Sequence, residues 1–204
     1  LRRLFAGQPF TVALWTNVPT ATITIGRGAD LPEDVTILNY SPYLSNFGDG
    51  INPVIYDTDG SITDDYFGLG MKNSVLGFAG STASNCRYTE GIAVINGFIG
   101  VTNTTMGILL AHEIGLLIGL DHTQLDDLQG GLALSNYPLM YPFAARSVLT
   151  LHEDDVAAVS ALYPDVTLNS VYGQVSGVFV RADGVTPVRG ANLWATETTT
   201  NKVY

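Results

Sequence analysis

The chain has 204 residues, of which 46% are hydrophobic and only 14% are charged, against roughly 25% charged residues in typical soluble domains. Its formal net charge of −10 would repel nucleic acid and anionic membranes, so we expect neither as a partner. No stretch of about 18–20 uninterrupted apolar residues occurs, so we expect no membrane span. Polarity comes mainly from Thr, Ser and Asn, which we associate with secreted or cell-surface proteins, and we expect an extracellular location.

The N-terminal quarter of the chain is predicted to contain two strands and a short helix. Residues 9–16 and 21–25 are rich in β-branched side chains that partly alternate with others, which favours strands. Residues 31–40 suit a short helix with Asp30 as its N-cap, because a proline occupies the first helical position. Residues 41–53 are rich in Gly, Asn and Pro and are predicted to be a loop.

An acidic turn follows at residues 57–65, with carboxylates at Asp57, Asp59, Asp64 and Asp65. Clustered carboxylates on a glycine-containing turn suit a hard cation, so a Ca²⁺ site is one interpretation. The pattern differs from an EF-hand, because one acidic position is missing and no glutamate closes the loop. The other interpretation is a solvated acidic turn in which aspartates cap backbone groups. The sequence leaves both open.

Two further strands are predicted at residues 75–79 and 91–95. Cys86, the only cysteine, lies between them and has no partner for an internal disulfide. It is either an unpaired small residue or the partner of a cysteine outside this chain.

A buried helix is predicted to begin near Asn103 or Thr104, either of which could act as its N-cap. An apolar run follows, and no proline interrupts it. The helix is expected to end at Gly119, because glycine can adopt the positive φ that a sharp turn requires. This turn would bring His122 back towards His112.

The helix and its turn carry a motif with a known relative. Residues 112–122 read His-Glu-Ile-Gly-Leu-Leu-Ile-Gly-Leu-Asp-His and resemble the extended zinc signature H-E-x-x-H-x-x-G-x-x-H of the metzincin peptidases. Residues 137–142, Tyr-Pro-Leu-Met-Tyr-Pro, resemble the Met-turn of the matrixin branch. Residues 151–164 resemble the helix that closes a matrixin catalytic domain. Three elements in the same order make a chance match improbable, and the resemblance extends from about residue 76 to residue 164.

The resemblance implies an α+β metzincin-like catalytic domain over residues 1–164, with a twisted mixed sheet, an active-site helix, a Met-turn around Met140 and a closing helix. It implies Zn²⁺ held by His112 and His122, with Glu113 as the general base that takes a proton from water activated by the zinc. The implied function is that of a zinc-dependent metalloendopeptidase, which would pair an extended peptide or protein substrate with an edge strand of the sheet. Matrixins often carry structural calcium, which agrees with a site in the acidic turn.

One residue departs from the signature. Leu116 occupies the second ligand position, where the metzincins have histidine, and leucine cannot bind zinc. A catalytic zinc site uses three protein ligands, so we expect weakened zinc binding and impaired activity. Leu116 is a natural inactivating substitution, a variant or error, or the mark of a site remodelled around two histidines. His152 or Asp121 could replace the missing ligand, but the position of His152 at a helix start and the expected orientation of Asp121 disfavour both.

Two other functions remain open at this point. The chain is alternatively a catalytically inactive module that binds peptides or surface polymers as part of a larger secreted protein, a pseudoenzyme. A purely structural segment of a large surface protein is the third interpretation. Stoichiometric zinc would favour the peptidase interpretation over the binding interpretation.

After residue 164 the character of the sequence changes. Residues 165–170 are predicted to be a linker, and residues 171–204 a truncated β-sandwich with strands at 172–178 and 187–195 joined through a turn at Asp183. The pattern Gly-x-Val followed by Pro-Val-x-Gly-Ala is similar to the first hairpin of carboxypeptidase-regulatory-like domains. Such a sandwich would be incomplete here, so we expect the chain to be part of a larger parent protein. Unpaired edge strands would not fold stably alone.

Overall fold

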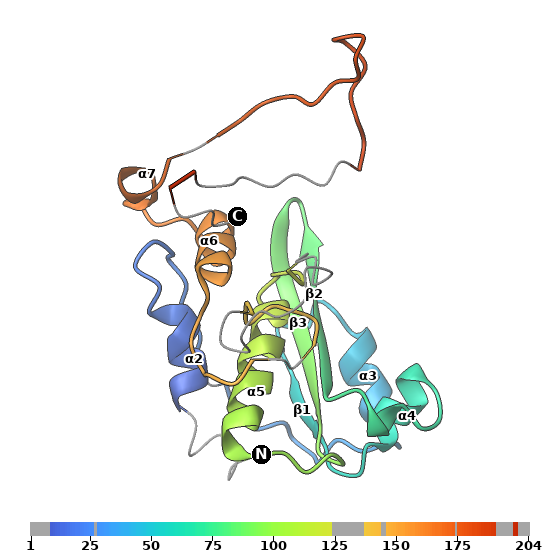
Figure 1. Cartoon of the computed structure of the whole chain (residues 1–204). Coiled ribbons are helices and arrows are strands. Elements are labelled where there is room, and N and C mark those ends of the chain that lie inside the picture. Colours follow the sequence, from blue (N-terminus) through green and yellow to red (C-terminus); the bar gives the residue numbers. More distant parts are fainter. Residues whose placement is uncertain are drawn as a thin grey trace. The chain divides into compact units, whose positions relative to one another are not determined.

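The computed structural model describes residues 9–26, 28–123, 137–143, 146–173, 175–190 and 198–199 (Figure 1). Contacts divide the chain into two units, Leu1–Asp165 and Val166–Tyr204. The described residues form six α-helices, one short 3₁₀ helix and a three-stranded sheet, so the predicted α+β class is confirmed at this level. Among these residues, no helix has the length and hydropathy needed to cross a membrane.

The sheet is mixed and has the strand order β1-β3-β2. Strand β1 (Val54–Asp57) runs parallel to the central strand β3 (Arg87–Asn96), and β2 (Gly77–Ser84) runs antiparallel to β3. The two antiparallel strands are joined at Asn85 and Cys86, which both have positive φ, as a two-residue hairpin turn requires. The predicted strands at residues 75–79 and 91–95 fall within β2 and β3, which are longer. Strand β2 lies at an edge of the described sheet.

Each face of the sheet packs against its own hydrophobic cluster. Helix α5 (Asn103–Leu117) packs against β2 and β3 and belongs to the larger cluster, which also contains Ile95 (Figure 1). The neighbouring residue Val94 belongs to the smaller cluster, together with Ile62 of helix α4 (Ser61–Phe67). Because successive side chains of a strand point to opposite faces of the sheet, the neighbours Val94 and Ile95 are expected to lie in different clusters. The sheet therefore fixes the position of α5 from one side.

The prediction of a strand at residues 9–16 is wrong. These residues form helix α2 (Pro9–Thr16), which packs against α5. The sequence held a signal for a helix, since proline is favoured at the first helical position, where its missing N–H is not needed. The fully buried Trp15 anchors α2 to α5, and this tertiary packing outweighs the strand propensity of the β-branched residues.

Three other N-terminal predictions need correction. In place of a strand at residues 21–25, the structure has only an isolated bridge between Ala21 and Pro164. Residues 31–39 do not form the predicted helix, and helix α3 (Tyr40–Ser45) instead begins at Tyr40 and extends into the predicted loop. Local turn bonds explain the difference, because the backbone N–H of Thr36 donates to the Asn39 side chain and interrupts the predicted helix.

The remaining elements are a short 3₁₀ helix η1 (Met71–Asn73), the closing helix α6 (Glu153–Leu162) and helix α7 (Leu168–Val171). The closing helix was predicted, whereas α7 begins inside the predicted linker.

In the second unit, the turn predicted at Asp183 is confirmed. It is flanked by a single bridge between Val180 and Pro187. The predicted strand at residues 172–178 is not formed by its described residues, and residues 191–195 of the other lie outside the described residues. A two-stranded hairpin is only marginally stable in water, so strands are not expected to extend without a further partner. The identity of the unit as a truncated β-sandwich stays a prediction.

Candidate metal site

Helix α5 places the first two residues of the motif. Its N-cap is Thr102, which precedes both predicted candidates, Asn103 and Thr104, and the Thr102 side chain accepts a hydrogen bond from the backbone N–H of Thr105. The helix ends as predicted, with Gly119 at a φ of 97°. The backbone N–H of Leu120 then donates to the Gly115 carbonyl oxygen, which closes the turn. The chain after this turn runs back along the helix.

His112 and His122 converge. Their Nε2 atoms lie 3.2 Å apart, although ten residues separate them in the chain. Two imidazole nitrogens bound to one tetrahedral zinc at about 2.0–2.1 Å each would lie about 3.3–3.4 Å apart. The spacing fits two ligands of one metal ion, and without metal it fits a hydrogen bond between the two imidazoles.

The orientation of His112 is fixed from its other side. Its Nδ1 lies 2.7 Å from the carbonyl oxygen of Leu139, which can only accept, so Nδ1 carries the proton and donates it. The Nε2 lone pair is thereby left free to face His122. Burial lowers the pKa of His112, and the nearby His122 lowers it further, while the bond to Leu139 acts in the opposite direction. The lowered pKa favours the neutral form, which a metal ligand needs.

Glu113 is a buried carboxyl group with an unsatisfied oxygen. Its side chain is 2% exposed, and its Oε2 has no hydrogen-bond partner among the described residues. Burial raises the pKa of Glu113 to about 8. Its Oε1 lies against Gly77 of β2, where an added Cβ would come within 2.8 Å of this oxygen. A buried polar atom without a partner is costly, and such groups cluster at functional sites.

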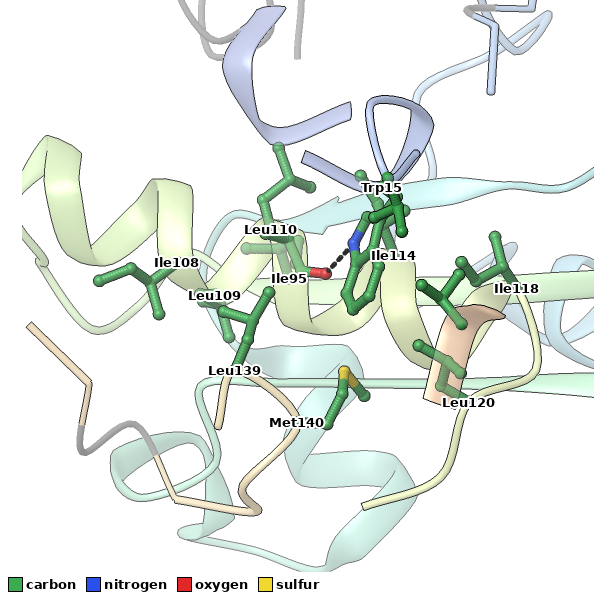
Figure 2. Packing of buried hydrophobic residues seen from close by; sticks show 13 residues of the cluster. Trp15, Ile95, Ile108, Leu109, Leu110, Ile114, Ile118, Leu120, Leu139 and Met140 are labelled. Carbon is green, nitrogen blue, oxygen red and sulfur yellow. Dashed lines mark hydrogen bonds between the residues drawn. The ribbon is translucent and has the colours of Figure 1, made fainter. Parts of the chain in front are cut away.

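Met140 lies directly against α5, on the turn of helix that follows His112. A Cβ at Gly115 would approach the Met140 Sδ to 2.4 Å and a Trp15 ring carbon to 2.9 Å. Trp15 also donates a hydrogen bond of 2.9 Å from its Nε1 to the Ala111 carbonyl oxygen (Figure 2). The indole of α2 and the thioether of Met140 therefore both require a glycine at position 115.

Replacing Gly115 with alanine is expected to destabilise the chain by about 1–3 kcal/mol, because the rigid Trp15 ring cannot move away from the new methyl group. Urea unfolding followed by circular dichroism measures this change. Gly80→Ala is the matched control, since no atom lies within 4 Å of a Cβ at Gly80. Equal stability of the two variants would contradict the packing around Gly115.

The third ligand position is filled by an apolar side chain. Leu116 is partly buried and packs against the larger hydrophobic cluster. Of the two candidate substitutes, His152 is the N-cap of α6 and its Nδ1 accepts from the backbone N–H of Asp154. Asp121 accepts from the backbone N–H of His122 at 2.7 Å. The part of the chain that the structure describes contains no group of three His, Cys, Asp or Glu residues able to hold a metal. The donor set thus fits two of the three ligands of a catalytic zinc.

Asp155, which the sequence did not single out, supports the turn that contacts His112. Its side chain is fully buried, at 0% exposed. One carboxylate oxygen accepts from the backbone N–H of Leu139 at 2.8 Å and of His152 at 2.7 Å, and the other accepts from the N–H of Met140 at 3.0 Å. The available signal was its place three residues after His152, because this is the spacing of a capping box.

The four aspartates of the acidic turn have separate protein partners. Asp57 is 2% exposed and caps α4 by accepting from the backbone N–H groups of Ile62 and Thr63. The other three bond to neighbouring segments: Asp59 accepts from Ser61, Asp64 from the backbone of Lys72, and Asp65 from Tyr40. This arrangement agrees with the capping interpretation, and calcium binding stays a prediction. Cys86 is exposed in the β2–β3 turn.

Comparisons with known proteins add no relative. No protein-family model matches the chain, and no curated protein matches it. The metzincin resemblance therefore rests on the sequence motifs and stays a prediction.

Proposed function

We propose that residues 1–164 are a matrixin-like zinc metalloendopeptidase domain whose activity is impaired by Leu116. The observation that supports this proposal most strongly is the 3.2 Å separation of the His112 and His122 Nε2 atoms. In the metal-free chain this contact is a hydrogen bond, and it supports the proposal because it joins the two histidines that occupy ligand positions of the signature. The buried Glu113 beside His112, with an unsatisfied oxygen, adds the group that such an enzyme needs as a general base.

In this proposal each residue has a distinct role. Zinc, when bound, supplies an electrophile that polarises a carbonyl group and lowers the pKa of water. His112 and His122 hold the metal through Nε2, and the Leu139 carbonyl keeps His112 in the required tautomer. Glu113 accepts the proton of the attacking water and passes it to the leaving amine. Burial raises its pKa to about 8 in the metal-free chain, which is near neutral pH, so the carboxyl group can both accept a proton and return it.

The substrate in this proposal is an extended peptide. Strand β2 is an edge strand of the sheet, and no further strand pairs with it among the described residues, so we propose that its outer edge pairs with the peptide. Gly77 at the start of β2 lies against the Glu113 carboxyl group. A peptide paired with β2 would thus pass close to the general base. We place this domain outside the cell, in keeping with its composition, as part of a larger parent protein.

The proposal is tested by comparing the zinc affinities of three histidine variants. His112→Ala and His122→Ala are each expected to weaken zinc binding by more than the roughly 10–100-fold that loss of an outer-shell contact causes. His152→Ala, the matched control, is expected to leave it unchanged, because His152 caps α6. Competition against a fluorescent zinc chelator measures all three affinities. A large loss of zinc affinity in His152→Ala, or no loss in His112→Ala and His122→Ala, would show that zinc binds elsewhere.

A second candidate function is a catalytically inactive peptide-binding module. The packing of Leu116 against the hydrophobic cluster favours it, because an apolar residue at this position serves stability and not metal binding. Peptide affinity that is the same with and without zinc would support this function over the first.

A further inference from the structure

One peptide group lies between His112 and Asp155. The carbonyl oxygen of Leu139 accepts the His112 Nδ1–H at 2.7 Å, and the N–H of the same peptide group, which belongs to Met140, donates to the Asp155 Oδ1 at 3.0 Å. The imidazole and the carboxylate thus bond to opposite ends of a single amide. We propose that Asp155 is a positioning residue that fixes the tautomer and orientation of His112 through this peptide group.

The first physical argument is polarisation. Hydrogen bonds that run in a chain through one amide strengthen each other, so an anion at the N–H end makes the carbonyl oxygen a better acceptor. Asp155 is fully buried, so water does not compete for its oxygens. The stronger acceptor favours the tautomer with the proton on Nδ1 and the lone pair on Nε2, which faces His122.

The second argument is geometric. Asp155 also accepts from the N–H of Leu139, so two successive N–H groups are held by one carboxylate and the carbonyl between them cannot rotate freely. A carboxylate often orients a metal-binding histidine by direct contact. Here the carboxylate would act indirectly, through a backbone peptide group.

A buried cation stabilises this arrangement. Burial lowers the pKa of Arg146, which is 9% exposed, and the charge of Asp155 offsets this lowering in part. The Arg146 guanidinium donates to the carbonyl oxygen of Tyr137, on the same turn as Leu139. Arg146 and Asp155 therefore hold the turn from its two ends.

The test is the tautomer of His112 in ¹⁵N-histidine-labelled chain without metal, read from its two ring nitrogen resonances. The wild-type chain is expected to show a protonated Nδ1 and an unprotonated Nε2. Asp155→Asn is expected to lower the ratio of this tautomer to the other several-fold. The variant is measured in the cold with sucrose, which stabilises folded proteins. Glu153→Gln, which removes one charge from the same turn of α6, is the matched control and is expected to leave the ratio unchanged.

A second readout uses metal and rests on the proposed function. In a Leu116→His chain, adding Asp155→Asn is expected to weaken zinc binding by about 10–100-fold, with no such loss from Glu153→Gln. If the tautomer changes but no variant binds zinc, the proposed function fails and the role of Asp155 stands. If zinc binds as proposed but a folded Asp155→Asn chain keeps the wild-type tautomer, the role of Asp155 is overturned. Should Asp155→Asn not fold, the wild-type spectrum decides, because a proton on Nε2 of His112 would overturn the inference by itself.

Discussion

The Leu116→His chain is expected to cut an unstructured protein in the presence of zinc, with a rate at least 100-fold above that of the chain as written. Position 116 lies one helical turn after His112, on the same face of α5, so an imidazole there can approach the same ion. Loss of an outer-shell contact already costs roughly 10–100-fold in metal affinity or activity, and loss of a direct ligand should cost more. Leu116 is only partly buried, so the helix can accept the polar ring at this position.

Cleavage of a fluorescently labelled, unfolded casein measures this gain. Leu116→Gln is the matched control, since it introduces a polar side chain of similar length that is a poor zinc ligand. Adding Glu113→Gln to Leu116→His is expected to lower the rate by about 10²–10⁴-fold, the usual contribution of a general base. Equal activity of the chain as written would show that another ligand has taken the third position. No activity in any variant would favour the peptide-binding module.

Glu113→Gln in the metal-free chain is expected to stabilise the fold by about 3–5 kcal/mol at pH 8 and by little near pH 4.5. Burial raises the pKa of Glu113 from 4.5 to about 8, so the folded state keeps a proton that the unfolded state has already lost. The unfolded state therefore binds fewer protons between these two values, and the free energy of unfolding falls as pH rises through this window. Glutamine, which carries no charge, does not have this dependence.

The difference between the variant and the wild-type chain isolates Glu113. Burial lowers the pKa of His112, which gives the opposite slope below about pH 6.5, but both chains share this term. Urea unfolding at half-unit steps from pH 4.5 to 8 measures the difference. Glu33→Gln, at an exposed glutamate, is the control. Its effect on the free energy of unfolding should not increase with pH. A constant difference across the whole pH range would contradict a buried Glu113.

The parts of the fold that the sequence predicted are the parts that local patterns control. Helix α5, its end at Gly119 and the return of the chain to His122 depend on residues within one segment. Helix α2 was missed because its packing depends on Trp15 and Ala111, which are 96 residues apart in the chain. The parallel pairing of β1 with β3 is equally non-local and cannot be read from either strand alone.

The candidate site likewise combines features that local sequence predicts with features that only the fold provides. Spacing pointed to His112, Glu113 and His122, but only the fold gives the 3.2 Å between the two Nε2 atoms. The spacing from His152 signals the capping role of Asp155, but its bonds to the backbone of residues 139–140 join distant segments and no local pattern encodes them. For Asp57 the sequence allowed a metal ligand or a helix cap, and both use the same residue type at the same position.

The central claim is that His112 and His122 bind one metal ion. Anomalous diffraction at the zinc absorption edge, from crystals of the Leu116→His chain grown with zinc, tests it most directly. The account predicts one peak about 2.0–2.1 Å from the Nε2 atoms of His112, His122 and the introduced histidine. The absence of a zinc peak between His112 and His122 would contradict it.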